Sequence, residues 1–420
     1  MTSVSSGGNV TFDNTAPTIN TAAIASNNTV TTLAKVGDVV TVSIVSAENL
    51  HSISGLTVNS QSVDVAQVTK TSATQWSFTY TMTSSDTEGD LGYGFTANDL
   101  PGNSIALTYS SSLTFDRTAP TLSAVSISSN NAVNTLAKVG DAITVAFTSS
   151  ETVQDPPTVT IGGTGATVSG SGTSWSATRT MASGDSEGGV VFAINFLDLT
   201  GNAGTQVTAT TDASGITFDK TAPTMSAIAI ASNNANYTTL AKVDDSVKVT
   251  FTSSETIQTP TSTIGGFNAD ISGATTSWIA AKLMTISDSE GSVGLTIDYM
   301  DLAGNDGTQS TATVGGSDVV FDKTAPTMAV TIVSDNPTTT LAKPDDNVTI
   351  TITSSENLYQ PPTVAIDGNT ETVNPSTQAT SYTSTRVMQT SDSQGDITFV
   401  VGGISDLAGN TVTNLSLIHI

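Results

Sequence analysis

Acidic residues recur at regular spacing along this chain, and they are the residues whose types and positions could carry chemistry. The sequence has 420 residues, with 37 Asp+Glu, 12 Lys+Arg, two His and no Cys, and a formal net charge of −25. Acidic residues follow Phe12, Phe115, Phe218 and Phe321, in steps of 103 residues. Other acidic residues recur with nearly the same period, and each set of residues at equivalent positions of the repeats is here called a column. Several carboxylate oxygens at one point can bind Ca²⁺, and a carboxylate pair can act in acid–base catalysis.

The composition argues against several other kinds of site. Phosphate contacts need clustered Lys and Arg, which this sequence does not have, so we expect no nucleic-acid partner. Disulfides and thiolate metal sites need Cys, and no apolar run approaches the roughly 18 residues of a membrane span. Paired acids recur in every repeat, whereas an active site is normally built once, and no Ser has a plausible His partner. The sequence therefore predicts that the chain is not an enzyme.

Four tandem repeats organise the chain. The segment Phe-Asp-x-Thr-Ala-Pro-Thr begins at residues 12, 115, 218 and 321, and Asp-Leu-x-Gly-Asn begins at residues 99, 198, 301 and 406. The last six residues break the repeat and resemble one reading frame of a sequencing adaptor. We predict the end of a preceding repeat at 1–14, repeats at 15–117, 118–220 and 221–323, a truncated repeat at 324–414, and an artefact at 415–420.

Alternating apolar residues predict β-strands within each repeat. Val40, Val42 and Ile44 alternate with Ser and Thr, as the sides of a half-buried strand do, and equivalent runs occur in the later repeats. Gly, Asn, Asp and Pro separate these runs, and no stretch has a convincing helical face. About 100 residues with seven or so short strands fit an antiparallel β-sandwich. We expect the Trp column, which includes Trp175, to lie in the core.

The repeated motifs resemble those of a known family. Asp-x-Thr-Ala-Pro-Thr, the strand ending in Ser-Ser-Glu, and Asp-Leu-Ala-Gly-Asn are similar to the bacterial immunoglobulin-like (Big) tandem repeats of large surface and secreted adhesins. The resemblance implies an all-β fold of tandem immunoglobulin-like antiparallel β-sandwiches arranged as an extended rod. It also implies an extracellular or bacterial cell-surface location.

The function implied is that of a non-catalytic stalk segment, a rigid spacer that supports cell adhesion or biofilm formation. Its partners would be the neighbouring repeats of the same chain and an unknown distal ligand on a host cell, matrix or carbohydrate. The alternative is an accessory carbohydrate- or protein-binding region of a secreted enzyme. A further domain elsewhere in a longer protein would separate the two, because sandwich folds serve many functions.

An immunoglobulin-like strand order brings the acidic columns together at the repeat junctions. The linker acid, the strand-end Glu and the Asp-Leu-x-Gly-Asn acid would share one end of a sandwich, facing the Asp-x-Glu turn of the preceding repeat. Such a convergence predicts Ca²⁺ that stiffens each junction. The predicted ligand sets are Asp86, Glu88, Asp116, Glu151 and Asp198; then Asp185, Glu187, Asp219, Glu255 and Asp301; then Asp288, Glu290, Asp322, Glu356 and Asp406.

Simpler roles for the same residues stay open. Loop acids are often only solvated, and an Asp in a turn often caps its own backbone, as Asp in Asp-Leu-x-Gly-Asn could. The Lys column, at Lys35, Lys138, Lys242 and Lys343, is expected to pair locally with a nearby Asp, a contact worth only about 0–1 kcal/mol when exposed.

Overall fold

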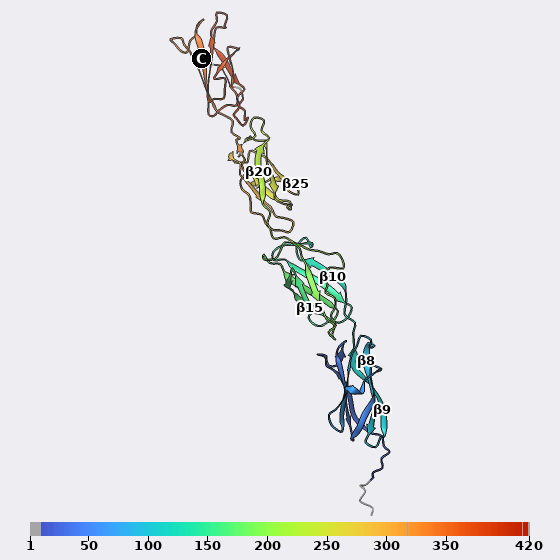
Figure 1. Cartoon of the computed structure of the whole chain (residues 1–420). Helices are drawn as coiled ribbons and strands as arrows, with labels where there is room; N and C mark the ends of the chain where they lie inside the picture. The colour runs from blue at the N-terminus through green and yellow to red at the C-terminus, as the bar shows by residue number, and fades with distance from the viewer. Residues whose placement is uncertain (1–9, 317, 414, 419–420) are drawn as a thin grey trace, which may run out of the picture. The chain divides into compact units, whose positions relative to one another are not determined.

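A computed structural model describes residues 10–316, 318–413 and 415–418 (Figure 1). Residues 1–9, 317, 414 and 419–420 lie outside the described residues, and they belong to the predicted segments 1–14, 221–323, 324–414 and 415–420. The chain forms two compact units, with the boundary after Asp219. Among the described residues there is no α-helix, only the short 3₁₀ helix η1 (Val65–Gln67). No helix in these ranges has the length and apolar character needed to cross a membrane.

The first repeat forms a sandwich of two sheets. Its strands are β1 (Ile19–Ser26), β2 (Leu33–Ala34), β3 (Val39–Ser46), β4 (Leu50–Val58), β5 (Gln61–Ser62), β6 (Val68–Lys70), β7 (Gln75–Thr81), β8 (Gly89–Asp99) and β9 (Ser104–Phe115). One sheet has the order β1-β3-β7-β6 and the other the order β2-β9-β8-β4-β5. Figure 1 shows β8 and β9 side by side, and they pair antiparallel along most of their length.

The second repeat builds the same sandwich from shorter strands. They are β10 (Leu122–Ser129), β11 (Leu136–Ala137), β12 (Ala142–Ser149), β13 (Thr158–Ile161), β14 (Thr164–Gly165), β15 (Thr167–Ser171), β16 (Ser174–Thr180), β17 (Gly188–Gly189), β18 (Phe192–Asn195) and β19 (Thr217–Phe218). Their orders are β10-β12-β16-β15, β11-β19-β17 and β14-β13-β18. The longer second sheet of the first repeat is thus divided into two parts here.

The strands of the third repeat correspond one to one with the strands of the second repeat. Its strands are β20 (Met225–Ser232), β21 (Leu240–Ala241), β22 (Ser246–Ser253), β23 (Thr261–Ile264), β24 (Phe267–Asn268), β25 (Asp270–Ala274), β26 (Ser277–Leu283), β27 (Gly291–Ser292), β28 (Leu295–Asp298) and β29 (Val320–Phe321). Their orders are β20-β22-β26-β25, β21-β29-β27 and β24-β23-β28.

The fourth repeat has two sheets but no counterpart of β11, β17 or β19 among its described residues. Its strands are β30 (Met328–Ser334), β31 (Asn347–Ser354), β32 (Thr363–Ile366), β33 (Asn369–Glu371), β34 (Val373–Asn374), β35 (Ser381–Val387), β36 (Thr398–Gly402) and β37 (Leu415–Ile418). The orders are β30-β31-β35-β34 and β33-β32-β36-β37. Residues 415–418, predicted to be an artefact, thus pair with β36, while their origin stays a prediction.

Alternation along the strands puts the apolar residues into one core per repeat. Val40, Val42 and Ile44 are buried, and the Ser and Thr between them are not. Trp175 is 4% exposed, and its indole N–H donates to the Gly172 carbonyl at 3.1 Å, so the Trp column is core. The prediction of an all-β fold with antiparallel sandwiches is confirmed. The predicted domain boundaries and the extended rod stay predictions.

One detail of the topology differs from a purely antiparallel sandwich. The short strands β2, β11 and β21 pair parallel with the strand that ends in Phe115, Phe218 and Phe321. The Leu-Ala sequence of each short strand precedes the Lys loop and is too short to read as a strand from alternation alone. This pairing holds the final Phe of the first three repeats in the core, where it is almost fully buried.

Candidate metal centre

Three carboxylates meet where the linker enters the second repeat. Oxygen atoms of Asp116, Glu151 and Asp198 all lie within 4.8 Å of one another. Asp116 directly follows β9, and its backbone N–H donates to the Ala34 carbonyl at 2.9 Å. Glu151 lies just after β12, and Asp198 lies in the loop after β18, where it bridges Val153. The structure therefore brings together three acids that the sequence places in separate columns.

The Asp-Leu-x-Gly-Asn turn fixes the buried acid of this cluster. Asp198 Oδ1 accepts the Asn202 backbone N–H at 2.8 Å and the Thr200 hydroxyl at 2.6 Å. Its Oδ2 accepts the Asn202 side-chain amide at 2.7 Å, and that amide also donates to the Asp116 carbonyl at 3.0 Å. Gly201 has a φ of +89°, a conformation that favours glycine. The turn thus caps itself, as the simpler interpretation expects, and also ties the linker to the cluster.

Glu88 lies at the linker beside the cluster. Its carboxylate accepts the Arg117 backbone N–H at 3.1 Å and the Thr118 hydroxyl at 2.7 Å. Asp116 Oδ1 accepts the Thr118 backbone N–H at 2.9 Å, so both acids hold the same stretch of linker. Glu88 belongs to the first repeat, and its negative charge acts on the acidic cluster at the start of the second repeat.

The electrostatics of this cluster are repulsive. Burial raises the pKa of Glu151 above its ordinary value, and the like charges of Asp116, Asp198 and Glu88 raise it further, with no basic side chain opposing them. Burial also raises the pKa of Asp116, against the effect of the Thr118 N–H and together with Asp198 and Glu88. No hydrogen bond to the Glu151 carboxylate occurs among the described residues. Lone pairs of several carboxylates therefore face one another, which is an arrangement that a cation would stabilise.

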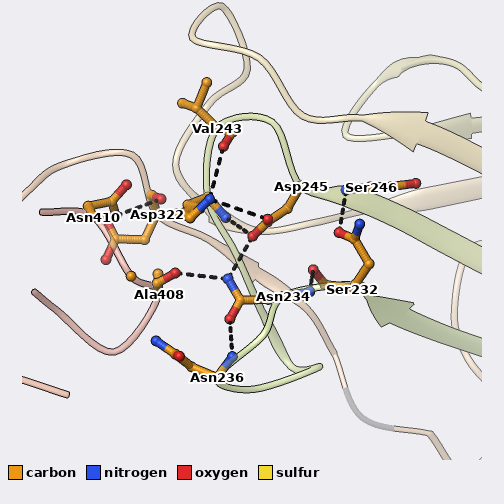
Figure 2. Close-up of polar contacts among 12 residues, drawn as sticks. Ser232, Asn234, Asn236, Val243, Asp245, Ser246, Asp322, Ala408 and Asn410 are labelled. Carbon is orange, nitrogen blue, oxygen red and sulfur yellow. Dashed lines mark hydrogen bonds and ion pairs between the residues drawn. The ribbon is translucent and has the colours of Figure 1, made fainter. Parts of the chain in front are cut away.

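The second unit contains an equivalent cluster of Asp322, Glu356 and Asp406. The Asn410 side-chain amide donates to the Asp322 carbonyl at 3.1 Å, and both residues are drawn in Figure 2. Burial and the charges of Asp322, Asp406 and Glu290 raise the pKa of Glu356. Glu290 accepts the Lys323 backbone N–H and the Thr324 hydroxyl, as Glu88 does with its own linker.

A third cluster, of Asp13, Glu48 and Asp99, lies at the start of the first repeat. This cluster is not among the predicted sets, because those sets lie only at junctions between two of the four repeats. The signal was present, since all three residues belong to the same acidic columns as Asp116, Glu151 and Asp198. Asp219 ends the first unit, whereas Glu255 and Asp301 lie in the second, so that predicted set stays a prediction.

The first acid of each Asp-x-Glu turn contacts its own hairpin, and its predicted part in a calcium site stays a prediction. Asp86 accepts the Thr83 backbone N–H at 2.6 Å and the Tyr80 hydroxyl at 2.9 Å, both from its own hairpin. The equivalent acids pair with a cation on the preceding strand: Asp185 with Arg179 and Asp288 with Lys282, each at 2.6 Å, and Asp392 with Arg386 at 2.7 Å. Because these carboxylates turn back to their own strand, Asp86 is not grouped with Asp116. Glu187 lies in the equivalent turn of the second repeat.

The outer face of the Asp-Leu-x-Gly-Asn turn contacts the preceding repeat. In the first unit, the Asn28 amide donates to the Thr200 carbonyl at 3.0 Å and Lys35 Nζ donates to the Gly201 carbonyl at 2.6 Å. In the second unit, Figure 2 shows Asn234 between Asp245 and Ala408, with hydrogen bonds of 2.6 and 2.8 Å. Asn28 and Asn234 therefore each join two consecutive repeats by donating to a backbone carbonyl.

The Lys column divides between two roles. Lys343 pairs with Asp346 at 3.0 Å and Lys242 with Asp245 at 3.5 Å, as the local-pair interpretation predicts. Lys35 instead reaches the next repeat, while its own backbone N–H donates to Asp38. The sequence could not separate these roles, because each depends on how closely two repeats approach.

Comparisons with known proteins agree with the motifs. Residues 74–169 match a family model described as a bacterial Ig-like domain (group 3), which confirms the resemblance predicted from the sequence. The matched stretch is less than a quarter of the chain and runs from β7 in the first repeat into β15 in the second. No curated protein matches the chain.

Several solved structures are similar. One is described as a Ca²⁺-stabilized adhesin that helps an Antarctic bacterium reach out and bind ice, at 20% identity, 97% coverage of this chain, 99% of that chain and a TM-score of 0.44. A 1.5-MDa bacterial ice-binding adhesin is 17% identical, with 74% of this chain and 99% of that chain covered and a TM-score of 0.39. A tetra-tandem repeat in the extending region of a large adhesion protein is 16% identical, with 94% of this chain and 99% of that chain covered and a TM-score of 0.31. Because these values are low, the function of this chain rests on its own residues.

Proposed function

We propose that this array of bacterial immunoglobulin-like repeats is a non-catalytic stalk segment of an extracellular bacterial adhesin, with junctions that calcium stiffens. The observation that carries the proposal is the cluster of Asp116, Glu151 and Asp198, whose oxygens lie within 4.8 Å of one another beside the linker. The same arrangement recurs at Asp322, Glu356 and Asp406. A site repeated once per structural unit suits a mechanical role better than a catalytic one.

The chemistry of the cluster suits a hard cation. Every candidate ligand is a carboxylate oxygen, which Ca²⁺ prefers, and the described clusters include neither His nor Cys, which Zn²⁺ uses. Asp116 comes from the linker, whereas Glu151 and Asp198 come from the sandwich that follows. A bound calcium ion would therefore tie the linker to the next sandwich and neutralise the repulsion among the acids.

Contacts on both sides of the linker would complete the stiffening. Glu88 of the preceding repeat binds the linker backbone at Arg117, and Asn28 and Lys35 bind the far side of the Asp-Leu-Thr-Gly-Asn turn. Pro120 fixes its own φ and restricts Ala119 to extended conformations, which removes a source of bending. A joint held at these points would transmit orientation from one repeat to the next.

The role in adhesion, the location and the partners follow from this proposal. Such a segment would stand between a bacterial surface and a distal binding module, in support of cell adhesion or biofilm formation. Its partners would be the neighbouring repeats. The strongly acidic composition keeps the chain soluble and disfavours docking on anionic lipid.

Small-angle X-ray scattering of the first unit, residues 10–219, tests the mechanical part of the proposal. With about millimolar calcium, the range in which extracellular calcium modules bind, we expect a larger maximum dimension than with chelator. Asp116→Asn should remove the difference while the circular dichroism stays unchanged. The same dimension with calcium and with chelator would reject calcium stiffening.

A further inference from the structure

The first repeat differs from the second in how the chain returns from the Asp-Leu-x-Gly-Asn turn. The segment from the turn Asp to the final Phe spans 16 residue steps in the first repeat, from Asp99 to Phe115, and 20 in the second, from Asp198 to Phe218. In the first repeat this segment forms one strand, β9, which pairs with β8 along most of its length. In the second repeat it makes only isolated bridges before β19. The shorter segment thus gives the first repeat a long hairpin.

The outer edge of β9 is free along most of its length. The strand β2 pairs only with Thr114 and Phe115, so residues 104–113 have no strand on that side in the described part of the chain. This stretch contains no charged residue and no Pro, and the irregularity in the β8–β9 pairing lies beyond Ser110. Such features usually protect a free edge, because an unprotected edge can pair with another strand. The edge of β9 can therefore accept a further strand.

Alternation along the hairpin determines which backbone groups of β9 face outward. The Asp99 N–H donates to the Asn103 carbonyl at 3.0 Å, so these two residues form a hydrogen-bonded pair. Hydrogen-bonded pairs alternate with non-hydrogen-bonded pairs in an antiparallel ladder, so every second residue of β9 directs its N–H and C=O groups away from β8. The residues that face outward are Ala106, Thr108 and Ser110. All three are exposed.

The neighbouring strand β1 also has a free edge in the first repeat. In the second repeat the returning chain covers this position: the Thr211 N–H donates to the Val125 carbonyl at 2.8 Å, and the Val125 N–H donates to the Thr211 hydroxyl at 2.9 Å. In the first repeat the carbonyl of Ala22, which matches Val125, accepts the Tyr93 hydroxyl at 2.8 Å instead. The Tyr93 ring stacks on Tyr109 with the ring centroids 5.1 Å apart. Side chains therefore fill this side of the sandwich, and no main chain covers it.

The distribution of charge favours a second copy of this chain as the partner at this edge. The chain has a net charge of −25, so two copies repel each other wherever acids face acids. Residues 14–34, which include β1, and residues 100–115, which include β9, contain no charged side chain. Two copies can therefore approach each other along these strands without that repulsion, whereas a basic partner would find no acid on them.

Contacts between consecutive repeats leave this edge free. The second repeat is contacted by the first at Thr200 and Gly201 of its Asp-Leu-Thr-Gly-Asn turn. By the same geometry, a repeat that precedes the first would contact the turn at 99–103 and not the middle of β9. The edge is therefore available to a partner that lies beside the chain.

We propose that the β9 edges of two copies pair antiparallel about a twofold axis at Thr108, so that two stalk segments associate side by side. Ala106 of each copy then lies opposite Ser110 of the other, and the outward N–H and C=O groups form main-chain hydrogen bonds. On the inner face, the half-buried Leu107 of one copy lies opposite Tyr109 of the other, and the two side chains cover each other. The contact uses the same surface of both copies and closes at a dimer.

Sedimentation equilibrium of the full chain tests the association and its site. We expect the mass of the wild type to rise with concentration from 42.7 kDa toward twice that value. Thr108→Lys places two like charges opposite each other at the axis, so it should weaken the dimer by at least about tenfold. Ser43→Lys is the matched control, because Ser43 is exposed on β3, which pairs with β1 on one side and β7 on the other. This control should associate as the wild type does, and circular dichroism should show that both variants fold.

Disulfide cross-linking tests the pairing itself, since the chain has no natural Cys. Under mild oxidation, Thr108→Cys should give a covalent dimer, because hydrogen-bonded partners in an antiparallel pair have Cα atoms about 5.5 Å apart, a distance that a disulfide spans. Ser43→Cys should give at least about tenfold less dimer. A wild type that stays monomeric up to about 1 mM, equal association of Thr108→Lys and the wild type, or equal yields from the two Cys variants would overturn the proposal.

Discussion

Calcium should raise the stability of the first unit markedly. At about 100 times its dissociation constant, a ligand that binds only the folded state adds about 2.7 kcal/mol per site. For a unit of this size that corresponds to a rise of roughly 5–10 °C in the unfolding temperature. The cause is that calcium compensates the burial and the mutual repulsion that raise the pKa of Glu151 and Asp116. Differential scanning calorimetry of residues 10–219, with calcium and with chelator, measures the shift.

Two conservative variants sharpen this prediction. Asp116→Asn keeps an amide oxygen to accept the Thr118 N–H but removes one ligand charge, so it should lower the calcium-induced rise. Asp64→Asn removes one charge that belongs to none of the acidic clusters and retains the cap on Ala66 N–H, so its calcium response should match the wild type. If both variants respond as the wild type does, the cluster at Asp116 is not the calcium site.

Loss of the buried Trp should be the most destabilising single change within a repeat. Trp175→Ala should cost about 3–5 kcal/mol of unfolding free energy, as truncation of large core aromatics does. Trp175 lies opposite Phe147 in the β12–β16 pair, and its indole N–H holds the Gly172 carbonyl of its own hairpin. Because residues 118–220 contain the whole apolar cluster of the second repeat, this fragment should fold alone and permit the measurement.

Urea unfolding followed by far-ultraviolet circular dichroism measures this cost, since Trp fluorescence is lost with the side chain. Val139→Ala is the control, because Val139 is exposed in the same repeat and should change the free energy by less than about 0.5 kcal/mol. A fragment that stays unfolded even with calcium would remove the basis for treating each repeat as a separate sandwich.

The fold could be predicted because local signals repeat four times. A run such as Val40, Val42 and Ile44 is ambiguous alone, but its recurrence at one period fixes which positions face the core. In the fourth repeat, Tyr382 takes the place of the Trp found in the other three. Its hydroxyl accepts the Ala379 N–H, whereas the Trp175 indole N–H donates to the Gly172 carbonyl. The short parallel strands could not be predicted, because a Leu-Ala pair carries no periodicity.

The acidic clusters were predictable for a similar reason. Asp116, Glu151 and Asp198 each occupy a turn at the same end of an immunoglobulin-like strand order, so topology alone brings them together. The contacts of Asp86 with Tyr80 and Thr83 were not predicted, because the two acids of this turn, at positions 86 and 88, were treated as pointing the same way. Arg179, Lys282 and Arg386 lie six residues before the equivalent Asp, and this column could have shown that the Asp faces its own strand.

The contacts between repeats could not be predicted from the sequence. Lys35 and Lys242 stand in one column, yet only the first donates to a carbonyl of the next repeat. The difference depends on packing between two sandwiches, which no local pattern records.

Isothermal titration of calcium into residues 10–219 tests the central claim most directly. We predict binding at about millimolar calcium or below, with one ion fewer bound when Glu151→Gln removes a ligand charge from the cluster. Asp64→Asn should bind as many ions as the wild type. No calcium binding by the wild type, or the same number of ions bound by Glu151→Gln, would contradict the account.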